Sequence, residues 1–145
     1  MKKKILLIED NVDDIDLTLR AFRKNHYNNI IDIAHDGVEA LEYINNINCN
    51  QIYENTIPAL ILLDIKLPKI DGLEVLKSLR SDKLTKLTPI VMLTSSNEEI
   101  DLKKSYEFGA NSYILKPIDF NSFVEVVNCL GLYWLFYNQT TGFAA

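Results

Sequence analysis

Four short apolar runs of the sequence each end at side chains that carry a charge or a hydroxyl group. In chain order, these side chains are Glu9, Asp10, Asp64, Thr94, Ser95 and Lys116. Carboxylate oxygens without histidine or cysteine suit Mg²⁺, and a lysine ammonium binds a phosphoryl group as a point charge. An ionised carboxylate is itself a nucleophile. The set therefore predicts a magnesium site at which a phosphoryl group is transferred to a carboxylate, with the central Asp64 as the acceptor.

The elements that must position these residues follow from the hydrophobic pattern. Apolar runs predict buried strands at residues 5–8, 30–34, 59–63, 90–93 and 112–115. Between and after them, helical spacing marks residues 13–24, 37–44, 73–79, 98–108 and 119–137, and the Asn-rich residues 45–57 are predicted as a loop. This strict alternation predicts an α/β fold, a doubly wound five-stranded parallel sheet with helices on both faces. Ligands of such sheets bind outside the carboxyl ends of the strands, where the six side chains lie.

Each of these residues taken singly would be an ordinary turn or helix-capping residue. Asp after a strand usually caps the next helix, and a Lys before a Pro is usually at the surface. Their shared position at the same end of four strands is what favours a site over four unrelated caps.

Length and composition restrict the class of protein. The chain has 145 residues, of which 48% are hydrophobic and 24% are charged, as in a single globular domain. A net charge of −5 argues against a nucleic-acid partner, whose binding surface would be basic. The apolar runs are too short for a signal peptide or a membrane span. Two cysteines are too few for a disulfide framework, so a cytoplasmic location is expected.

Four stretches of the sequence resemble the receiver domain of response regulators in two-component signalling. They are ILLIEDN at residues 5–11, LLDIKLPKIDG at 62–72, IVMLTS at 90–95 and GANSYILKP at 109–117. The resemblance covers residues from about 3 to about 130, nearly the whole chain. It implies a flavodoxin-like (βα)5 fold with strand order 2-1-3-4-5, a histidine kinase as phosphoryl donor, and a protein that catalyses only its own phosphorylation and dephosphorylation.

The resemblance also implies the magnesium ligands. Asp64 falls at the phospho-acceptor, and Glu9, Asp10 and the backbone carbonyl of Lys66 fall at the remaining protein ligands of Mg²⁺. Many members have Asp where this chain has Glu9, so Asp10 is the stronger prediction for a direct ligand. The Lys66 side chain is expected to shield the phosphoryl group from water, because the geometry of in-line attack is strict.

Further matches concern the response to phosphorylation. Thr94 falls at the switch hydroxyl that turns toward the phosphoryl group, and Ser95 lies beside it. Tyr113 falls at the rotating aromatic residue, and Lys116 at the lysine that contacts the phosphoryl group. The bond between Lys116 and Pro117 is expected to be cis, a form that only X–Pro bonds adopt at low cost.

The last residues of the sequence bear on which kind of receiver this is. Residues 1–137 are predicted as the receiver domain and residues 138–145 as a disordered tail, without an output domain. The output is therefore expected to be a contact with another protein, whose identity the sequence does not give. The residues Asn11–Asp14 and Gly131–Leu135 resemble those of small receivers that are partnered with phytochrome-like histidine kinases.

The last predicted helix carries more aromatic residues than one sheet face can cover. They are Tyr133, Trp134, Phe136 and Tyr137. Tyr and Trp are favoured in interfaces, so we expect this surface to form a homodimer or to dock a kinase.

Two other classes of protein use a similar sheet. A haloacid-dehalogenase-like phosphatase would have its nucleophile in an Asp-x-Asp pair after the first strand, whereas Asp64 is followed by Ile65 and Lys66. A flavodoxin-like cofactor binder would have a Ser/Thr/Gly loop after the first strand, where this chain has acidic residues. Turnover of small phosphate esters would indicate the first class, and a coloured protein the second.

Overall fold

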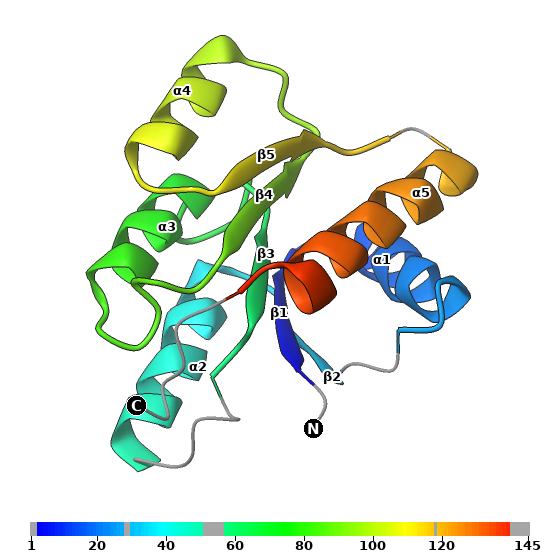
Figure 1. Cartoon of the computed structure of the whole chain (residues 1–145). Helices are drawn as coiled ribbons and strands as arrows, with labels where there is room; N and C mark the ends of the chain where they lie inside the picture. The colour runs from blue at the N-terminus through cyan, green and yellow to red at the C-terminus, as the bar shows by residue number, and fades with distance from the viewer. Residues whose placement is uncertain (1–2, 28–29, 51–56, 118, 140–145) are drawn as a thin grey trace.

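The five predicted apolar runs form one parallel sheet in the order β2-β1-β3-β4-β5 (Figure 1). A computed structural model describes residues 3–27, 30–50, 57–117 and 119–139 of the chain. The strands are β1 (Lys4–Ile8), β2 (Ile30–Ala34), β3 (Leu60–Leu63), β4 (Ile90–Thr94) and β5 (Ser112–Leu115). The doubly wound fold and the strand order that the sequence predicted are confirmed.

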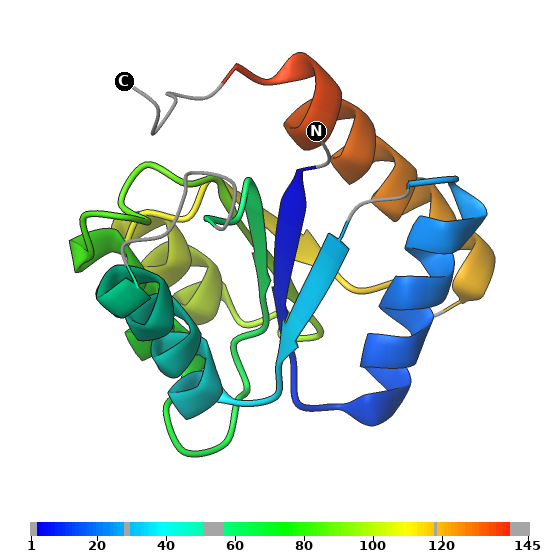
Figure 2. The same cartoon turned by 90° about the horizontal axis from the view of Figure 1, so that it is seen from below.

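Helices cover both faces of the sheet. They are α1 (Val12–Lys24), α2 (Gly37–Asn50), α3 (Gly72–Ser81), α4 (Glu99–Glu107) and α5 (Phe120–Leu130), with a further turn η2 (Gly131–Tyr137). Figures 1 and 2 show α1 and α5 together on one face and α2, α3 and α4 on the other. The central strands are therefore enclosed on both sides, which explains why their sequences are continuously apolar.

The core consists of two layers, one on each face of the sheet. Along β1, Leu6 and Ile8 point into the layer under α2 and α3, and Ile5 and Leu7 point into the layer under α1 and α5. All four are almost completely buried. Since the side chains of each strand are fixed by packing on both faces, the residue that follows the strand is held at a definite place on the sheet edge.

Helix α2 is longer than the sequence predicted. It continues to Asn50, so the prediction of a loop is wrong for residues 45–50, and residues 51–56 lie outside the described residues. Ile44 and Ile47 keep the helical spacing of three, and both belong to the core layer on this face. Packing of this apolar side outweighs the low helix propensity of the asparagines.

The last helix changes its hydrogen-bond pattern after Leu130. It reaches Tyr137 as predicted, but Gly131–Tyr137 is π-helical, and the amide of Asn138 donates to the carbonyl of Tyr133. The change begins where the ring of Tyr27 lies against Gly131, so close that any larger residue at position 131 would clash. Within the described part of the chain, no helix combines the length and apolar character that crossing a membrane requires. Residues 140–145 of the predicted tail lie outside that part.

The prediction of a cis bond before Pro117 is wrong. Among the described residues the backbone has no cis peptide bond, so the bond between Lys116 and Pro117 is trans. Trans is the lower-energy form even for X–Pro bonds. With this trans bond, the Lys116 side chain still reaches across the sheet edge to Glu9.

Gly72, the first residue of α3, lies directly on the loop that carries Asp64. A Cβ atom at this position would overlap the Asp64 carbonyl oxygen and lie 2.7 Å from the Ile65 Cα atom. The amide of Gly72 donates to the carbonyl of Ile65 over 2.8 Å. The absence of a side chain therefore allows α3 to begin against the loop after β3 and to fix its path.

We expect Gly72→Ala to lower the free energy of unfolding by about 1–3 kcal/mol, because the added methyl group meets backbone atoms that cannot turn away. Urea denaturation followed by circular dichroism measures this change. The control is Glu74→Ala, two residues along the same helix and exposed, which should change stability by less than about 0.5 kcal/mol. Equal stability of Gly72→Ala and the wild-type protein would contradict the packing argument.

Candidate functional site

The ammonium group of Lys116 lies among three carboxylates from three different elements. It forms ion pairs with Glu9, which follows β1, with Asp14 Oδ2 on α1 at 2.8 Å, and with Asp64 Oδ2, which follows β3, at 3.4 Å. The Lys116 side chain is only 8% exposed. The convergence of Glu9, Asp64 and Lys116 that the strand ends predicted is therefore present.

Burial and neighbouring charges act in opposite directions on the pKa values of Glu9 and Lys116. Burial raises the pKa of Glu9 to about 7, although the hydrogen bond from Lys116 lowers it. For Lys116, burial alone would favour the neutral amine, but the bonds to Asp14 and Glu9 and the field of Asp64 raise its pKa above the ordinary value. Lys116 is thus charged at neutral pH, and Glu9 takes up a proton more readily than an ordinary glutamate.

Oxygen atoms of Glu9, Asp10 and Asp64 lie close enough together to hold one cation. One carboxylate oxygen from each residue lies within 4.8 Å of the others, and Asp10 is exposed whereas Glu9 and Asp64 are buried. An all-oxygen set that is open to water on one side fits Mg²⁺, which keeps several water ligands. The backbone carbonyl of Lys66 stays a prediction as a further ligand.

The side chain of Asp64 is fixed through both of its oxygens. Oδ1 accepts a hydrogen bond of 2.7 Å from the amide of Ile65, and Oδ2 faces Lys116. Asp64 is 6% exposed. These two contacts fix the orientation of the carboxylate whose oxygen would attack phosphorus.

The residues predicted for the switch meet at Ser96. Thr94, which is fully buried, accepts a 3.2 Å hydrogen bond at its hydroxyl from the Ser96 amide, and the Tyr113 hydroxyl donates to the Ser96 carbonyl over 2.8 Å. The Lys116 amide donates to the Thr94 carbonyl, which joins the ends of β4 and β5. Ser95 is exposed. The parts that these residues play after phosphorylation stay predictions.

Sequence reasoning missed two acidic residues near the site. Asp14 lies in the first turn of α1, which begins at the same sheet edge as Glu9, and this proximity along the chain was the available signal. Asp101 on α4 is 7% exposed and contacts Ser96 and Lys66. Nothing in the local sequence distinguishes it from the other charged residues of α4.

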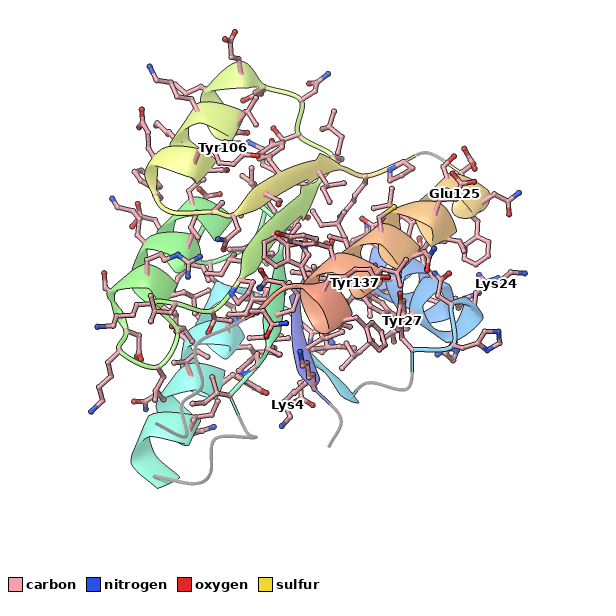
Figure 3. The ribbon with its side chains drawn as sticks, viewed as in Figure 1. Lys4, Lys24, Tyr27, Tyr106, Glu125 and Tyr137 are labelled. Carbon is pink, nitrogen blue, oxygen red and sulfur yellow. The ribbon has the colours of Figure 1, made fainter. Side chains whose placement is uncertain are left out.

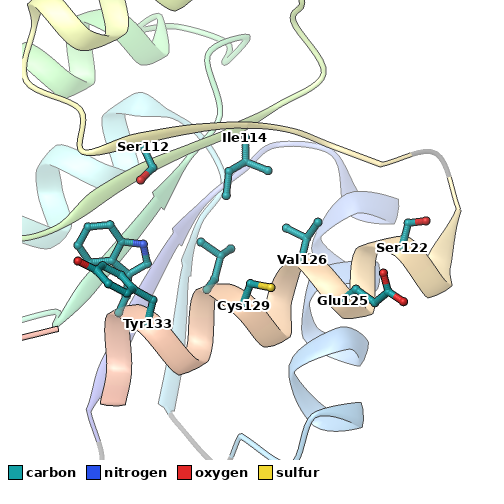
Figure 4. A pocket seen from close by; sticks show the side chains of 9 residues that line it. Ser112, Ile114, Ser122, Glu125, Val126, Cys129 and Tyr133 are labelled. Carbon is teal, nitrogen blue, oxygen red and sulfur yellow. The ribbon is translucent and has the colours of Figure 1, made fainter. Parts of the chain in front are cut away.

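The aromatic residues of the last helix are divided between core and surface. Trp134 packs on the core layer under α1 and α5. The centroid of its ring lies 4.8 Å from the centroid of the Tyr133 ring. Tyr133, Phe136 and Tyr137 are 53%, 63% and 70% exposed. Tyr133 and Trp134 also line a groove of about 520 Å³ between β5 and α5, which Figure 4 shows from close by. The exposed aromatic surface that the sequence predicted is therefore present, but Trp134 packs on the core and does not lie at the centre of this surface.

The chain is similar to known proteins along nearly its whole length. A family model, the response regulator receiver domain, matches residues 5–128. The probable methanogenesis regulatory protein FilR2 of Methanothrix harundinacea is 35% identical over 141 residues, which are 95% of this chain and 87% of FilR2. The response regulator Rcp1 of Synechocystis sp. is 34% identical over 134 residues, which are 92% of this chain and 89% of Rcp1.

Solved structures agree with these relatives. The crystal structure of the phosphorylated cyanobacterial phytochrome response regulator RcpA has a TM-score of 0.85 and 34% identity, and the match covers 98% of this chain and 100% of RcpA. The Mn²⁺-bound form of Rcp1 has a TM-score of 0.81 and 31% identity, over 97% of this chain and 99% of that one. The chain therefore belongs to the response regulator receiver domain family.

Proposed function

We propose that this protein is a response regulator that accepts a phosphoryl group from a histidine kinase on Asp64, with Mg²⁺ as cofactor. The observation that carries the proposal is the convergence of Glu9, Asp10 and Asp64 with the ammonium of Lys116 at one edge of the sheet. The Mn²⁺-bound form of Rcp1 supports a divalent cation in the family, and the phosphorylated form of RcpA supports the reaction.

The residues act on the incoming phosphoryl group in distinct ways. An oxygen of Asp64 attacks phosphorus, a new P–O bond forms, and the bond from phosphorus to the kinase histidine breaks. Lys116, 3.4 Å from Asp64 Oδ2, neutralises charge on the phosphoryl oxygens. A bound Mg²⁺ supplies the same neutralisation on the side of Glu9, Asp10 and the Lys66 carbonyl.

The switch follows from the same charges. A phosphoryl group on Asp64 adds acceptor oxygens, to which Thr94 and Ser95 donate. Thr94 then leaves the Ser96 amide, and Tyr113 exchanges its bond to the Ser96 carbonyl for the space that Thr94 vacates. The altered surface consists of α4, β5 and α5, and the output is a contact with another protein in the cytoplasm.

The likeness to RcpA supports a phytochrome-like histidine kinase as the partner. FilR2 is similar over the same length and is a probable regulator of methanogenesis, so the stimulus is set by the kinase rather than by the receiver fold. Phosphotransfer from the histidine kinases of the source organism identifies the partner.

Acetyl phosphate with Mg²⁺ is expected to add one phosphoryl group to the wild-type protein and none to Asp64→Asn, as measured by intact mass. Asp10→Asn should abolish labelling through loss of the metal. The control is Asp71→Asn, on the same loop and without a side-chain capping bond, which should label like the wild type. Labelling of Asp64→Asn at the wild-type level would refute Asp64 as the acceptor.

Mg²⁺ is expected to bind roughly tenfold more tightly at pH 8 than at pH 6, because a ligand must lose its proton to bind metal and the pKa of Glu9 is about 7. Below that pKa the proton competes with the metal, and above it Glu9 is ionised. Calorimetry in buffers of different ionisation enthalpy measures both affinity and proton release. Glu9→Gln should bind more weakly with little pH dependence, and an affinity equal at both pH values in the wild type would contradict this assignment.

We further propose that the exposed aromatic residues of η2 pair two copies of the chain. Tyr133 lines the groove between β5 and α5, Phe136 and Tyr137 are exposed on the same turn, and Leu115 of edge strand β5 is 50% exposed. Apolar surface in water costs roughly 25 cal/mol per Å², and a two-fold axis covers the same surface on both copies. Docking of the kinase on this surface is the competing use.

Sedimentation velocity at micromolar concentration is expected to show a dimer for the wild type and a monomer for Phe136→Ser with Tyr137→Ser. The matched control is Tyr106→Ser, which removes a half-exposed aromatic residue from α4 (Figure 3) and should leave the dimer intact. If the wild type sediments as a monomer both with and without beryllofluoride bound at Asp64, the pairing is refuted and kinase docking is the remaining use.

A further inference from the structure

Lys66, two residues after Asp64, forms an ion pair with Asp101 of α4. Its side chain is 62% exposed, and its ammonium lies 3.6 Å from Asp101 Oδ2 on α4. The ion pair joins the loop after β3 to the helix after β4. Ion pairs with one exposed partner are weak and form and break readily, so the ammonium is available to a stronger acceptor.

Asp101 is the fixed partner of this pair. Its side chain is 9% exposed, and the same Oδ2 atom accepts a 2.6 Å hydrogen bond from the Ser96 hydroxyl. Its carbonyl accepts a bond from the hydroxyl of Ser105 one turn later, which is itself fully buried. A charge this enclosed requires partners, and it holds its place while the flexible Lys66 side chain moves.

Both groups lie within electrostatic reach of the phospho-acceptor region. Burial is the main cause that raises the pKa of the Tyr113 hydroxyl; the fields of Asp101 and Asp64 raise it further, and the field of Lys66 lowers it. The charges of Asp101, Asp64 and Lys66 therefore all act on this hydroxyl group. A phosphoryl group on Asp64 carries about two negative charges, which makes it a rival acceptor for the Lys66 ammonium.

We propose that Asp101 is a positioning residue for the loss of the phosphoryl group: it holds Lys66 on the α4 side and so limits how long Lys66 covers phosphorus. The inference rests on the proposed function. In hydrolysis, the water oxygen attacks phosphorus opposite Asp64, and the P–O bond to Asp64 breaks with its electron pair returning to the carboxylate. Both protons of the water leave with the inorganic phosphate. Attack must be in line, so a Lys66 side chain over phosphorus slows it.

The test is the half-life of protein phosphorylated with acetyl phosphate and then freed of it, followed by intact mass. Asp101→Asn keeps a hydrogen-bond acceptor for Ser96. It should lengthen the half-life about two- to fivefold, because an ion pair with one exposed partner changes an equilibrium by about this factor. Lys66→Ala should shorten it. In the Lys66→Ala background, Asp101→Asn should have no further effect.

Two matched variants separate a positioning role of Asp101 from a structural one. Asp101→Glu keeps the charge and should restore the wild-type half-life. Glu99→Gln removes an exposed charge from the same helix and should not lengthen the half-life. An equal effect of Asp101→Asn with and without Lys66 overturns the proposal, as does a shorter half-life in the single variant.

A second measurement needs no change at Asp101. In wild-type protein with ¹³C- and ¹⁵N-labelled lysine, beryllofluoride and Mg²⁺ at Asp64 should shift the Lys66 side-chain resonance, which is assigned by its loss in Lys66→Ala. An unmoved resonance refutes transfer of Lys66 to the phosphoryl group. If acetyl phosphate adds no phosphoryl group to the wild-type protein, the proposed function itself is refuted.

Discussion

Three carboxylates, each on a different part of the chain, share one ammonium group at the carboxyl edge of the sheet. Glu9 and Asp64 are nearly excluded from water, and their charges would repel each other without Lys116. The ammonium group of Lys116 compensates both charges, and Asp14 on α1 is its third partner. The site is therefore held together by one positive charge that three carboxylates share.

The surroundings of the site follow from this constraint. Glu9 and Asp64 can be held close together only because β1 and β3 are neighbours, with Ile8 paired to Leu63 immediately before the two carboxylates. Gly72 brings α3 against the same loop. On the far side, Ser96 links Thr94 and Tyr113 to Asp101. A hydrogen-bonded path through Ser96 therefore joins the end of β4 to α4.

Much of the fold was predictable because its signals are local. A strand enclosed on both faces must be apolar at every position, so β1 and β3 were evident within one residue of their bounds. The end of α2 was not, because asparagines favour loops and only the packing of Ile47 on the core extends the helix. The packing of the Tyr27 ring against Gly131, where the π-helical turn begins, was likewise not evident, because Tyr27 is distant along the chain.

The sequence by itself determined which residues end the strands, and hence that Glu9, Asp64 and Lys116 share one edge of the sheet. Parallel strands align their carboxyl ends whatever their order, so residue type and position were sufficient. Only the tertiary structure decided that Asp14 shares Lys116 and that Asp101 holds Lys66. These pairs join elements far apart in the chain, and the angle at which each helix packs on the sheet, which no local pattern encodes, determines which charged side chains meet.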